Sequence, residues 1–234
     1  MGRDFFQSGP QLTNQYRADS LLQALLQSMI PEEHRAEVSK ELDRLGGRAA
    51  GDLLAWSEQA EREPPAHIPF DPWGRRIDEI RVSEAWQNLC AAAAEEGIVA
   101  TGYERKYGAH SRLVQFAKLY LYHPSSSFFS CPLAMTDGAA RALELFGSPE
   151  LKQGAFRNLT SRDPKKFWTS GQWMTERTGG SDVSGTSTVA VHKGGDDYEL
   201  HGTKWFTSAT TSEMAMTLAR IEGDVEGSRG LSLF

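Results

Sequence analysis

A turn with paired glycines constrains this 234-residue chain more than any other feature, in the sequence Gln172-Trp-Met-Thr-Glu-Arg-Thr-Gly-Gly-Ser-Asp182. Because Gly179 and Gly180 lack a Cβ atom, the main chain there can adopt φ > 0 and can approach an anion closely. Ser181 adds a hydroxyl donor to the same turn. Alone, such a cluster is typical of an ordinary turn. The glycine-turn segment, Gln172–Asp182, therefore predicts either a simple chain reversal or a phosphate-binding loop.

A second feature, the aromatic segment Lys204–Ser208, follows after a short hairpin. Its Trp205 and Phe206 offer flat apolar faces, and Thr207 offers a hydroxyl. We expect this segment to form a strand. Together the two segments predict a site for a ligand with a diphosphate and a planar ring, contacted by Gln172, Trp173, Met174, Thr175, Gly180, Ser181, Trp205, Phe206 and Thr207.

The pairing of the two segments resembles a known family. Met-Thr-Glu-x-x-Gly-Gly-Ser-Asp at 174–182, followed by Gly-x-Lys-Trp-Phe-x-Ser at 202–208, is similar to the acyl-CoA dehydrogenase family and to its AidB-like branch. Asp-Pro-Trp-Gly-Arg-Arg-Ile-Asp at 71–78, followed by Ala85-Trp86, resembles the same branch. Arg177 stands where many members of the wider family have proline. The resemblance implies FAD as cofactor, while Arg177 puts a standard fatty-acyl substrate in question.

The resemblance also implies roles for these residues. It places Thr175 near the flavin edge and Ser181 at the pyrophosphate, within the first FAD-binding segment. Residues 205–207 belong to the second. On chemistry alone, Glu176 or Asp182 could serve as a base beside the cofactor, but hydrogen bonding within the turn is the favoured interpretation.

The family's architecture is a helical N-terminal domain, a middle β domain and a C-terminal four-helix bundle. In such enzymes a glutamate of that bundle removes the α-proton of an acyl-CoA while a hydride passes to the flavin. We expect this chain to lack the bundle, so it contains no predicted catalytic residue. The predicted domains are therefore a helical one over 1–162, with an extended arm and a linker at 63–82, and part of the β domain over 163–234.

The resemblance predicts an FAD-dependent oxidoreductase of fatty acid metabolism that dehydrogenates an acyl-CoA thioester at its α,β bond as a homo-oligomer. This segment alone would be inactive. Two alternatives stay open. One is an AidB-type flavoprotein that binds nucleic acid or acyl chains without efficient turnover, and the other is a truncated form with no catalytic role.

Charge and composition bear on nucleic-acid binding, membrane association and cellular location. A formal net charge of −6 gives no general basic field, which argues against tight nonspecific nucleic-acid binding by this segment. No apolar run approaches the ~18 residues of a membrane span. Asp4 argues against a transit peptide, and Phe6 in place of Ser or Thr argues against myristoylation at Gly2. We expect a cytoplasmic protein, with mitochondrial and peroxisomal locations left open.

The cysteines and histidines, which are common metal ligands, are scattered along the sequence. Cys90 and Cys131 lack the spaced partners of a metal or redox motif, and we expect both to be reduced core thiols. No two histidines stand three or four positions apart, so the sequence predicts no metal site. The six histidines are His34, His67, His110, His123, His192 and His201.

Apolar periodicity predicts helices throughout the first part. Asp19 is the expected N-cap of a helix ending at Pro31, and Ser83 that of a helix closed by Gly97. A helical stretch over 32–61 should break at its glycines. Further helices are expected over 111–122, from Pro132 to 146, and from Pro149 onward. The prolines at 64–72 predict an extended connector, in which Arg75 and Arg76 point opposite ways or contact phosphate.

The periodicity changes near residue 166. Runs rich in β-branched and aromatic residues, separated by Gly and Asp turns, predict strands. Gly194-Gly195-Asp196-Asp197 predicts a hairpin. The sequence therefore predicts an α+β fold, an all-helical domain followed by an incomplete antiparallel β-barrel-like domain, with strands at 166–174, 186–192, 198–201, 204–208, 214–221 and 230–234.

Overall fold

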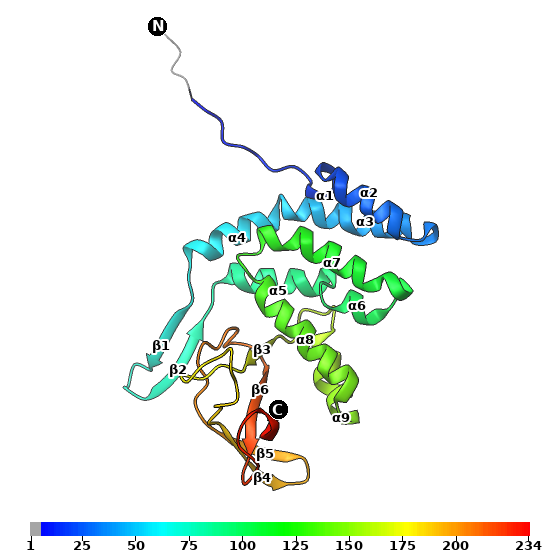
Figure 1. Ribbon diagram of the computed structural model, residues 1–234. Helices are drawn as coiled ribbons and strands as arrows, with labels where there is room; N and C mark the ends of the chain where they lie inside the picture. Colours follow the sequence, from blue (N-terminus) through cyan, green and yellow to red (C-terminus); the bar gives the residue numbers. More distant parts are fainter. Residues whose placement is uncertain (1–5) are drawn as a thin grey trace. The chain divides into compact units, whose positions relative to one another are not determined.

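The computed structural model describes residues 6–234, which form two compact units, one ending at Phe129 and the other spanning Ser130–Phe234. Residues 1–5, including Gly2 and Asp4, lie outside the described residues. The rest of the expected arm runs to Asn14 without helix or strand. The predicted order of a helical part followed by a strand-rich part is confirmed (Figure 1). The predicted domain boundary near residue 162 stays a prediction.

The first unit is built mainly of helices, and the predicted caps are confirmed. Asp19 accepts a hydrogen bond from the Leu22 amide at the start of α2, and Ser83 does the same for Trp86 at the start of α5. Gly97 ends α5 in the left-handed conformation. The helices are α1 (Gln15–Ala18), α2 (Ser20–Met29), α3 (Glu32–Ala49), α4 (Asp52–Arg62), α5 (Glu84–Glu96), α6 (Ala100–Glu104) and α7 (Ser111–Tyr122), with short 3-10 turns at Gly108–His110 and His123–Ser125.

The predicted break within residues 32–61 lies between α3 and α4, at residues 50–51. Gly46 remains inside α3 for a packing reason. A Cβ atom on Gly46 would lie 2.5 Å from both the Asn14 Oδ1 and the Tyr16 amide nitrogen, so glycine lets α1 pack closely against α3. Asn14 in turn caps α1 through hydrogen bonds to the Tyr16 and Arg17 amides.

The expected connector forms a two-stranded antiparallel hairpin, β1 (Ala66–Phe70) and β2 (Arg76–Arg81), which joins α4 to α5 (Figure 1). The register shifts beside Pro69, where a missing N–H is tolerated. Arg75 and Arg76 form ion pairs with Asp71 and Asp78, respectively. Both arginine side chains are largely exposed, so these are surface ion pairs, and a phosphate contact stays a prediction.

A buried charged network holds α3, α5 and α7 together. The fully buried Lys118 Nζ lies 2.5 Å from the Glu41 Oε2 and donates to the Glu96 carbonyl at 2.9 Å. The Glu96 carboxylate is itself buried and pairs with Arg44 and Arg48 at 2.7 and 3.1 Å. Buried charges of this kind depend on their partners, so the helical unit is sensitive to the loss of any one of them.

The second unit begins with helices and ends in a sheet. Thr136 of α8 accepts a hydrogen bond from the Ser170 amide at 3.0 Å, which fastens β3 to that helix. Cys90 of the first unit and Cys131 of α8 are half-buried, so the expectation that both are core thiols is wrong. The elements are α8 (Ser130–Phe146), α9 (Pro149–Leu151), a π-helical turn at Lys152–Phe156, α10 (Arg157–Leu159), β3 (Ser170–Trp173), β4 (Val189–Gly194), β5 (Asp197–His201), β6 (Met214–Ile221), a 3-10 turn at Ser228–Gly230 and β7 (Leu231–Leu233).

The sheet is organised around β6. Its strand order is β3-β6-β4-β5, with β7 also paired to β6. β3 and β4 run parallel to β6, while β5 is antiparallel to β4 and β7 to β6, so the sheet is mixed rather than antiparallel throughout as the sequence predicted. The predicted hairpin between β4 and β5 is confirmed. Within residues 6–234 the sheet is open and does not close into a barrel.

The predicted strand at 204–208 is wrong. These residues form an irregular loop between β5 and β6, and Phe206 has the left-handed φ of +60°. The left-handed residue turns the backbone out of an extended path, and the segment is held by single hydrogen bonds at Trp205 and Ser208 instead of a strand ladder. The predicted strand at 186–192 is shorter at its start, because β4 begins at Val189.

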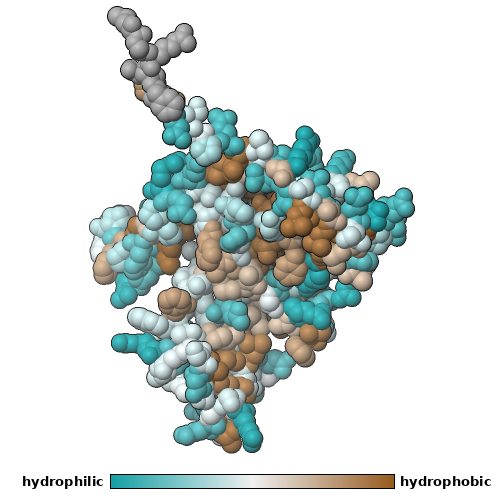
Figure 2. Space-filling model, turned by 45° about the horizontal axis from the view of Figure 1, so that its top comes forward, coloured by the Kyte–Doolittle hydropathy of each residue, from teal (hydrophilic) through white to brown (hydrophobic). Residues whose placement is uncertain are grey.

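Apolar side chains remain at the surface as patches between hydrophilic regions (Figure 2). One patch forms a groove between α2 and α7, lined by Leu21, Leu25, Leu113, Phe116 and Tyr120. Among residues 6–234, no helix is both long and apolar enough to cross a membrane.

Candidate functional site

The glycine-turn segment and the aromatic segment lie side by side in the second unit, held by two hydrogen bonds. The Trp205 amide donates to the Thr175 carbonyl at 2.9 Å, and the Trp173 indole Nε1 donates to the Ser208 carbonyl at 2.9 Å. Trp173 is the last residue of β3, and its own carbonyl accepts from the Thr217 hydroxyl of β6. The sheet therefore positions the first segment, and the first segment positions the second.

Glu176 forms a second connection between the segments. Its carboxylate is 4% exposed and accepts hydrogen bonds from the amides and hydroxyls of Ser187 and Thr188. The Lys204 Nζ donates to the same carboxylate at 2.9 Å. The site thus contains a buried carboxylate that joins three stretches of chain, one of them through an ion pair.

The turn itself is narrow. Glu176 and Gly179 exchange backbone hydrogen bonds of 3.1 Å in both directions. A Cβ atom on Gly180 would lie 2.6 Å from the Thr175 Oγ1, so a side chain there would displace that hydroxyl. The need for glycine at this position therefore comes from close approach, because Gly180 itself does not have a positive φ.

Several groups of the two segments are available to a ligand. The side-chain hydroxyls of Thr175, Ser181 and Thr207 form no hydrogen bond to any residue that the structure describes. Trp205 is 54% exposed and Phe206 85% exposed. Hydroxyl donors and uncovered aromatic rings near a narrow turn suit a cofactor with a diphosphate and a planar ring system. The residues present therefore fit FAD.

The remaining predicted positions have mixed surroundings. Gln172 is exposed within β3, and Met174 is half-buried just after it. Trp173 donates its indole N–H to the protein, so its role here is to hold the aromatic segment. The Arg177 guanidinium lies over the Trp205 ring, 5.6 Å from its centroid, as a cation–π pair. Arg177 thus contacts the aromatic segment.

The two carboxylates of the turn are unsuited to proton transfer. Burial raises the pKa of Glu176, but hydrogen bonds from Ser187, Thr188 and Lys204 outweigh it and hold that pKa far below its usual range. Hydrogen bonds from Ser184 lower the pKa of the exposed Asp182. A general base works best with a pKa near the operating pH, so neither group matches that role.

Replacing Glu176 with Gln is expected to weaken the dependence of stability on acid pH. The folded-state pKa of Glu176 lies below the unfolded value of about 4.3, so the unfolded state binds more protons. The stabilisation is therefore complete above that pH and is lost as the pH falls further. Urea unfolding between pH 7 and pH 3 should show a steeper loss for the wild type than for Glu176→Gln.

The matched control for that measurement is Glu226→Gln, which removes an exposed carboxylate with no ion pair to any described residue. It should follow the wild-type profile. Equal acid slopes for Glu176→Gln and the wild type would contradict the assignment of a lowered pKa to Glu176.

Sequence reasoning missed the partners of Glu176. Ser187 and Thr188 lie just before β4, outside both motifs, and nothing in their spacing indicates that they face the turn. Lys204 belongs to the Gly-x-Lys-Trp-Phe-x-Ser motif at 202–208. Its approach to Glu176 depends on the loop path of the aromatic segment, which the strand prediction concealed.

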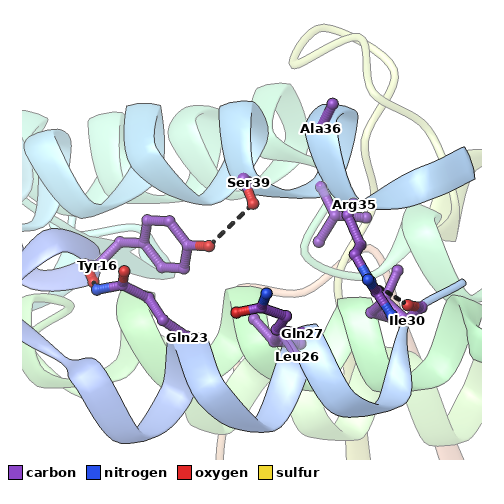
Figure 3. Close-up of a pocket in the computed structure, with 9 residues that line it drawn as sticks. Tyr16, Gln23, Leu26, Gln27, Ile30, Arg35, Ala36 and Ser39 are labelled. Atoms are coloured by element: carbon purple, nitrogen blue, oxygen red, sulfur yellow. Dashed lines mark hydrogen bonds between the residues drawn. The ribbon is translucent and has the colours of Figure 1, made fainter. Parts of the chain in front are cut away.

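The helical unit has a separate hollow between α2 and α3, with a volume of about 290 Å³ (Figure 3). The Tyr16 hydroxyl donates to the Ser39 Oγ across it, and the Arg35 Nε donates to the Ile30 carbonyl at one end. Leu26 of α2 contributes apolar lining to the hollow. The hollow holds no nucleophile beside a general base.

Metal-binding side chains do not gather anywhere in residues 6–234. No group of three or more His, Cys, Asp or Glu side chains in this range is close enough to hold a metal ion.

Two family models match successive parts of the chain. Residues 9–164 match the adaptive response protein AidB N-terminal domain, and residues 171–234 match the acyl-CoA dehydrogenase middle domain. The second match begins within β3 and includes both the glycine-turn and the aromatic segments.

Individual relatives agree with these matches. Acyl-CoA dehydrogenase family member 11 of Caenorhabditis elegans is 45% identical over 98% of this chain and 39% of the relative. A solved structure named Bd2924 apo-form is 60% identical, with a TM-score of 0.95 over 98% of this chain and 47% of that one. The solved structure of Caenorhabditis elegans ACDH-11 in complex with C11-CoA is 44% identical, with a TM-score of 0.93. The match covers 100% of this chain and 41% of that one.

The chain thus spans less than half the length of each of these three proteins. The two family models together account for most of its residues, and the second includes both segments of the candidate site. The chain belongs to the acyl-CoA dehydrogenase family, in its AidB-like branch.

Proposed function

We propose that this chain is the helical N-terminal domain and part of the middle β domain of an FAD-dependent flavoprotein that dehydrogenates an acyl-CoA thioester at its α,β bond. The domain boundary lies near residue 162, and the C-terminal bundle with its catalytic glutamate lies outside the chain. The complete protein is a homo-oligomer that we place in the cytoplasm, with mitochondrial and peroxisomal locations left open.

One observation carries the proposal: two motif segments are fastened together with their binding groups unused. Hydrogen bonds from Trp205 to Thr175 and from Trp173 to Ser208 hold the segments side by side. The hydroxyls of Ser181 and Thr207 then remain for the cofactor. FAD would supply the hydride acceptor, while the protein's own groups bind and orient it.

The proposed substrate class has independent support. A relative 44% identical to this chain was solved in complex with C11-CoA, which makes an acyl-CoA thioester the ligand to test first. The chain's own departure from the family pattern, Arg177 on Trp205, favours a second candidate: an AidB-type flavoprotein that binds acyl chains without efficient turnover. The net charge of −6 of this chain gives no support to an AidB-type flavoprotein that binds nucleic acid.

The test uses the full-length protein. Purified protein should carry flavin, visible by its absorbance, and anaerobic addition of medium- and long-chain acyl-CoAs should bleach it as the flavin is reduced. Binding of acyl-CoA without bleaching would favour the second candidate. Full-length protein that takes up no FAD would contradict both.

Residues 1–234 produced alone are expected to retain little or no FAD. The sheet of this chain is open, and Trp205 and Phe206 are uncovered, so a bound flavin would have protein on only part of its surface. Open strand edges also favour aggregation. Absorbance of the purified segment, compared with the full-length protein, measures the difference. Stoichiometric yellow cofactor on residues 1–234 would contradict this expectation.

A further inference from the structure

We infer that Glu176 and Lys204 form a positioning pair, which fixes the glycine-turn segment to the aromatic segment so that both halves of one cofactor find their ligands in place. The inference rests on the proposed FAD-binding function. It assigns Glu176 no part in proton transfer and no contact with the cofactor.

The hydrogen bonds of Glu176 leave it no capacity for a ligand. Its Oε1 accepts from the Thr188 amide at 3.1 Å, the Thr188 hydroxyl at 2.6 Å and the Lys204 Nζ at 2.9 Å. Its Oε2 accepts from the Ser187 amide at 2.7 Å and the Ser187 hydroxyl at 2.6 Å. An ionised carboxylate offers about four lone-pair sites, and five donors occupy them. Glu176 can therefore act only through the chain that it holds.

The ion pair and a backbone hydrogen bond form a double link between the segments. Thr175 and Glu176 are neighbours in the first segment, and Lys204 and Trp205 are neighbours in the second. The Thr175 carbonyl accepts from the Trp205 amide, and the Glu176 carboxylate accepts from the Lys204 Nζ, both at 2.9 Å. Two adjacent contacts fix both the distance between the two segments and their relative rotation.

Burial makes this link stronger than a surface ion pair. The side chains of Lys204 and Glu176 are only 10% and 4% exposed, so water competes little for their charges. Phe206 lies in the same segment in a left-handed conformation that an isolated chain adopts rarely. A fixed residue two positions earlier helps to keep that loop in its observed path.

The Glu176–Lys204 pair should raise the affinity for FAD. A ligand that must itself order two loose segments loses binding free energy to that ordering, whereas a preformed site does not. Releasing the pair should therefore lower FAD affinity even though every group that contacts FAD is still present.

The first experiment titrates FAD into full-length apoprotein at a temperature at which all variants are folded. Glu176→Gln and Lys204→Met should each weaken FAD binding about tenfold, because FAD binding must then supply the ordering that the lost hydrogen bond to a charged group provided. Lys204→Arg keeps the charge and should bind FAD close to the wild type. Glu96→Gln is the matched control, because it removes a buried carboxylate of the helical unit that also pairs with basic side chains.

The control separates positioning from general loss of stability. Glu96→Gln should lower the melting temperature yet leave FAD affinity within about twofold, on the order of 0.4 kcal/mol. If Glu176→Gln and Lys204→Met lose no more FAD affinity than Glu96→Gln, the inference is overturned.

The second experiment needs no cofactor. Hydrogen exchange of the apoprotein should speed up in residues 177–182 of the glycine-turn segment and in the aromatic segment when Lys204 is replaced by Met, and not when it is replaced by Arg. Unchanged exchange in Lys204→Met would overturn the inference. If exchange increases in Lys204→Met but the full-length protein takes up no FAD, the structural link is supported and the proposed cofactor is rejected.

Discussion

Lys118→Met is expected to lower the free energy of unfolding by about 3 to 5 kcal/mol, as found when one member of a buried ion pair is removed. The Lys118 Nζ is fully buried, 2.5 Å from the Glu41 Oε2, and it also donates to the Glu96 carbonyl and the Thr101 hydroxyl. Methionine fills a similar volume, so the loss comes from polar groups left without their cation. Urea unfolding followed by circular dichroism measures it.

Lys106→Met provides the comparison. Lys106 also pairs with Glu37 and lies near Glu41, but its side chain is about half exposed, so its removal should cost about 0 to 1 kcal/mol. Adding Glu41→Gln to Lys118→Met should recover part of the loss, because no buried carboxylate then lacks its lysine. A Lys118→Met protein within 1 kcal/mol of the wild type would show that the helices hold together without this network.

Ser181→Ala is expected to weaken FAD binding by the full-length protein about tenfold or more, and Thr207→Val to weaken it less. Loss of a hydrogen bond to a charged group, such as a pyrophosphate, is worth about 1.5 to 3 kcal/mol, against about 0.5 to 1.5 for a neutral one. We assign Ser181 to the pyrophosphate and Thr207 to the flavin edge. Thr207→Val should therefore mainly change the flavin's absorbance spectrum or its reduction rate.

The control for this pair is Ser228→Ala, which removes an exposed hydroxyl of the same unit outside both segments. Its FAD affinity and flavin spectrum should equal those of the wild type. Equally small effects of Ser181→Ala and Thr207→Val would mean that the cofactor is bound by other residues.

Local features of the fold could be predicted from the sequence. Asp19 and Ser83 begin their helices and Gly97 ends one, because capping depends on a few neighbouring residues. The turn between β4 and β5 follows from its Gly and Asp residues in the same way. The family resemblance, carried by residues 174–182 and 202–208, was equally local and is confirmed by the family-model matches.

Long-range contacts determined the rest. Trp205 and Phe206 have the composition of a strand, yet hydrogen bonds from Trp205 to Thr175 and from Lys204 to Glu176 hold this stretch as a loop. Intrinsic preference for a strand is weak beside such specific contacts. The proline-rich connector likewise became a hairpin, because a two-stranded ribbon tolerates a proline that a central strand would not.

The sequence by itself determined the order of helices and strands, the caps and turns, and the two segments that identify the family, because each depends on neighbouring residues. Only the tertiary structure decided that β6 is the centre of an open, mixed sheet and that Glu176 is a buried link rather than a base. The physical reason is burial. A carboxylate has the same chemistry in any sequence, but five donors brought from 11, 12 and 28 positions away lower its pKa and use all its hydrogen-bonding capacity.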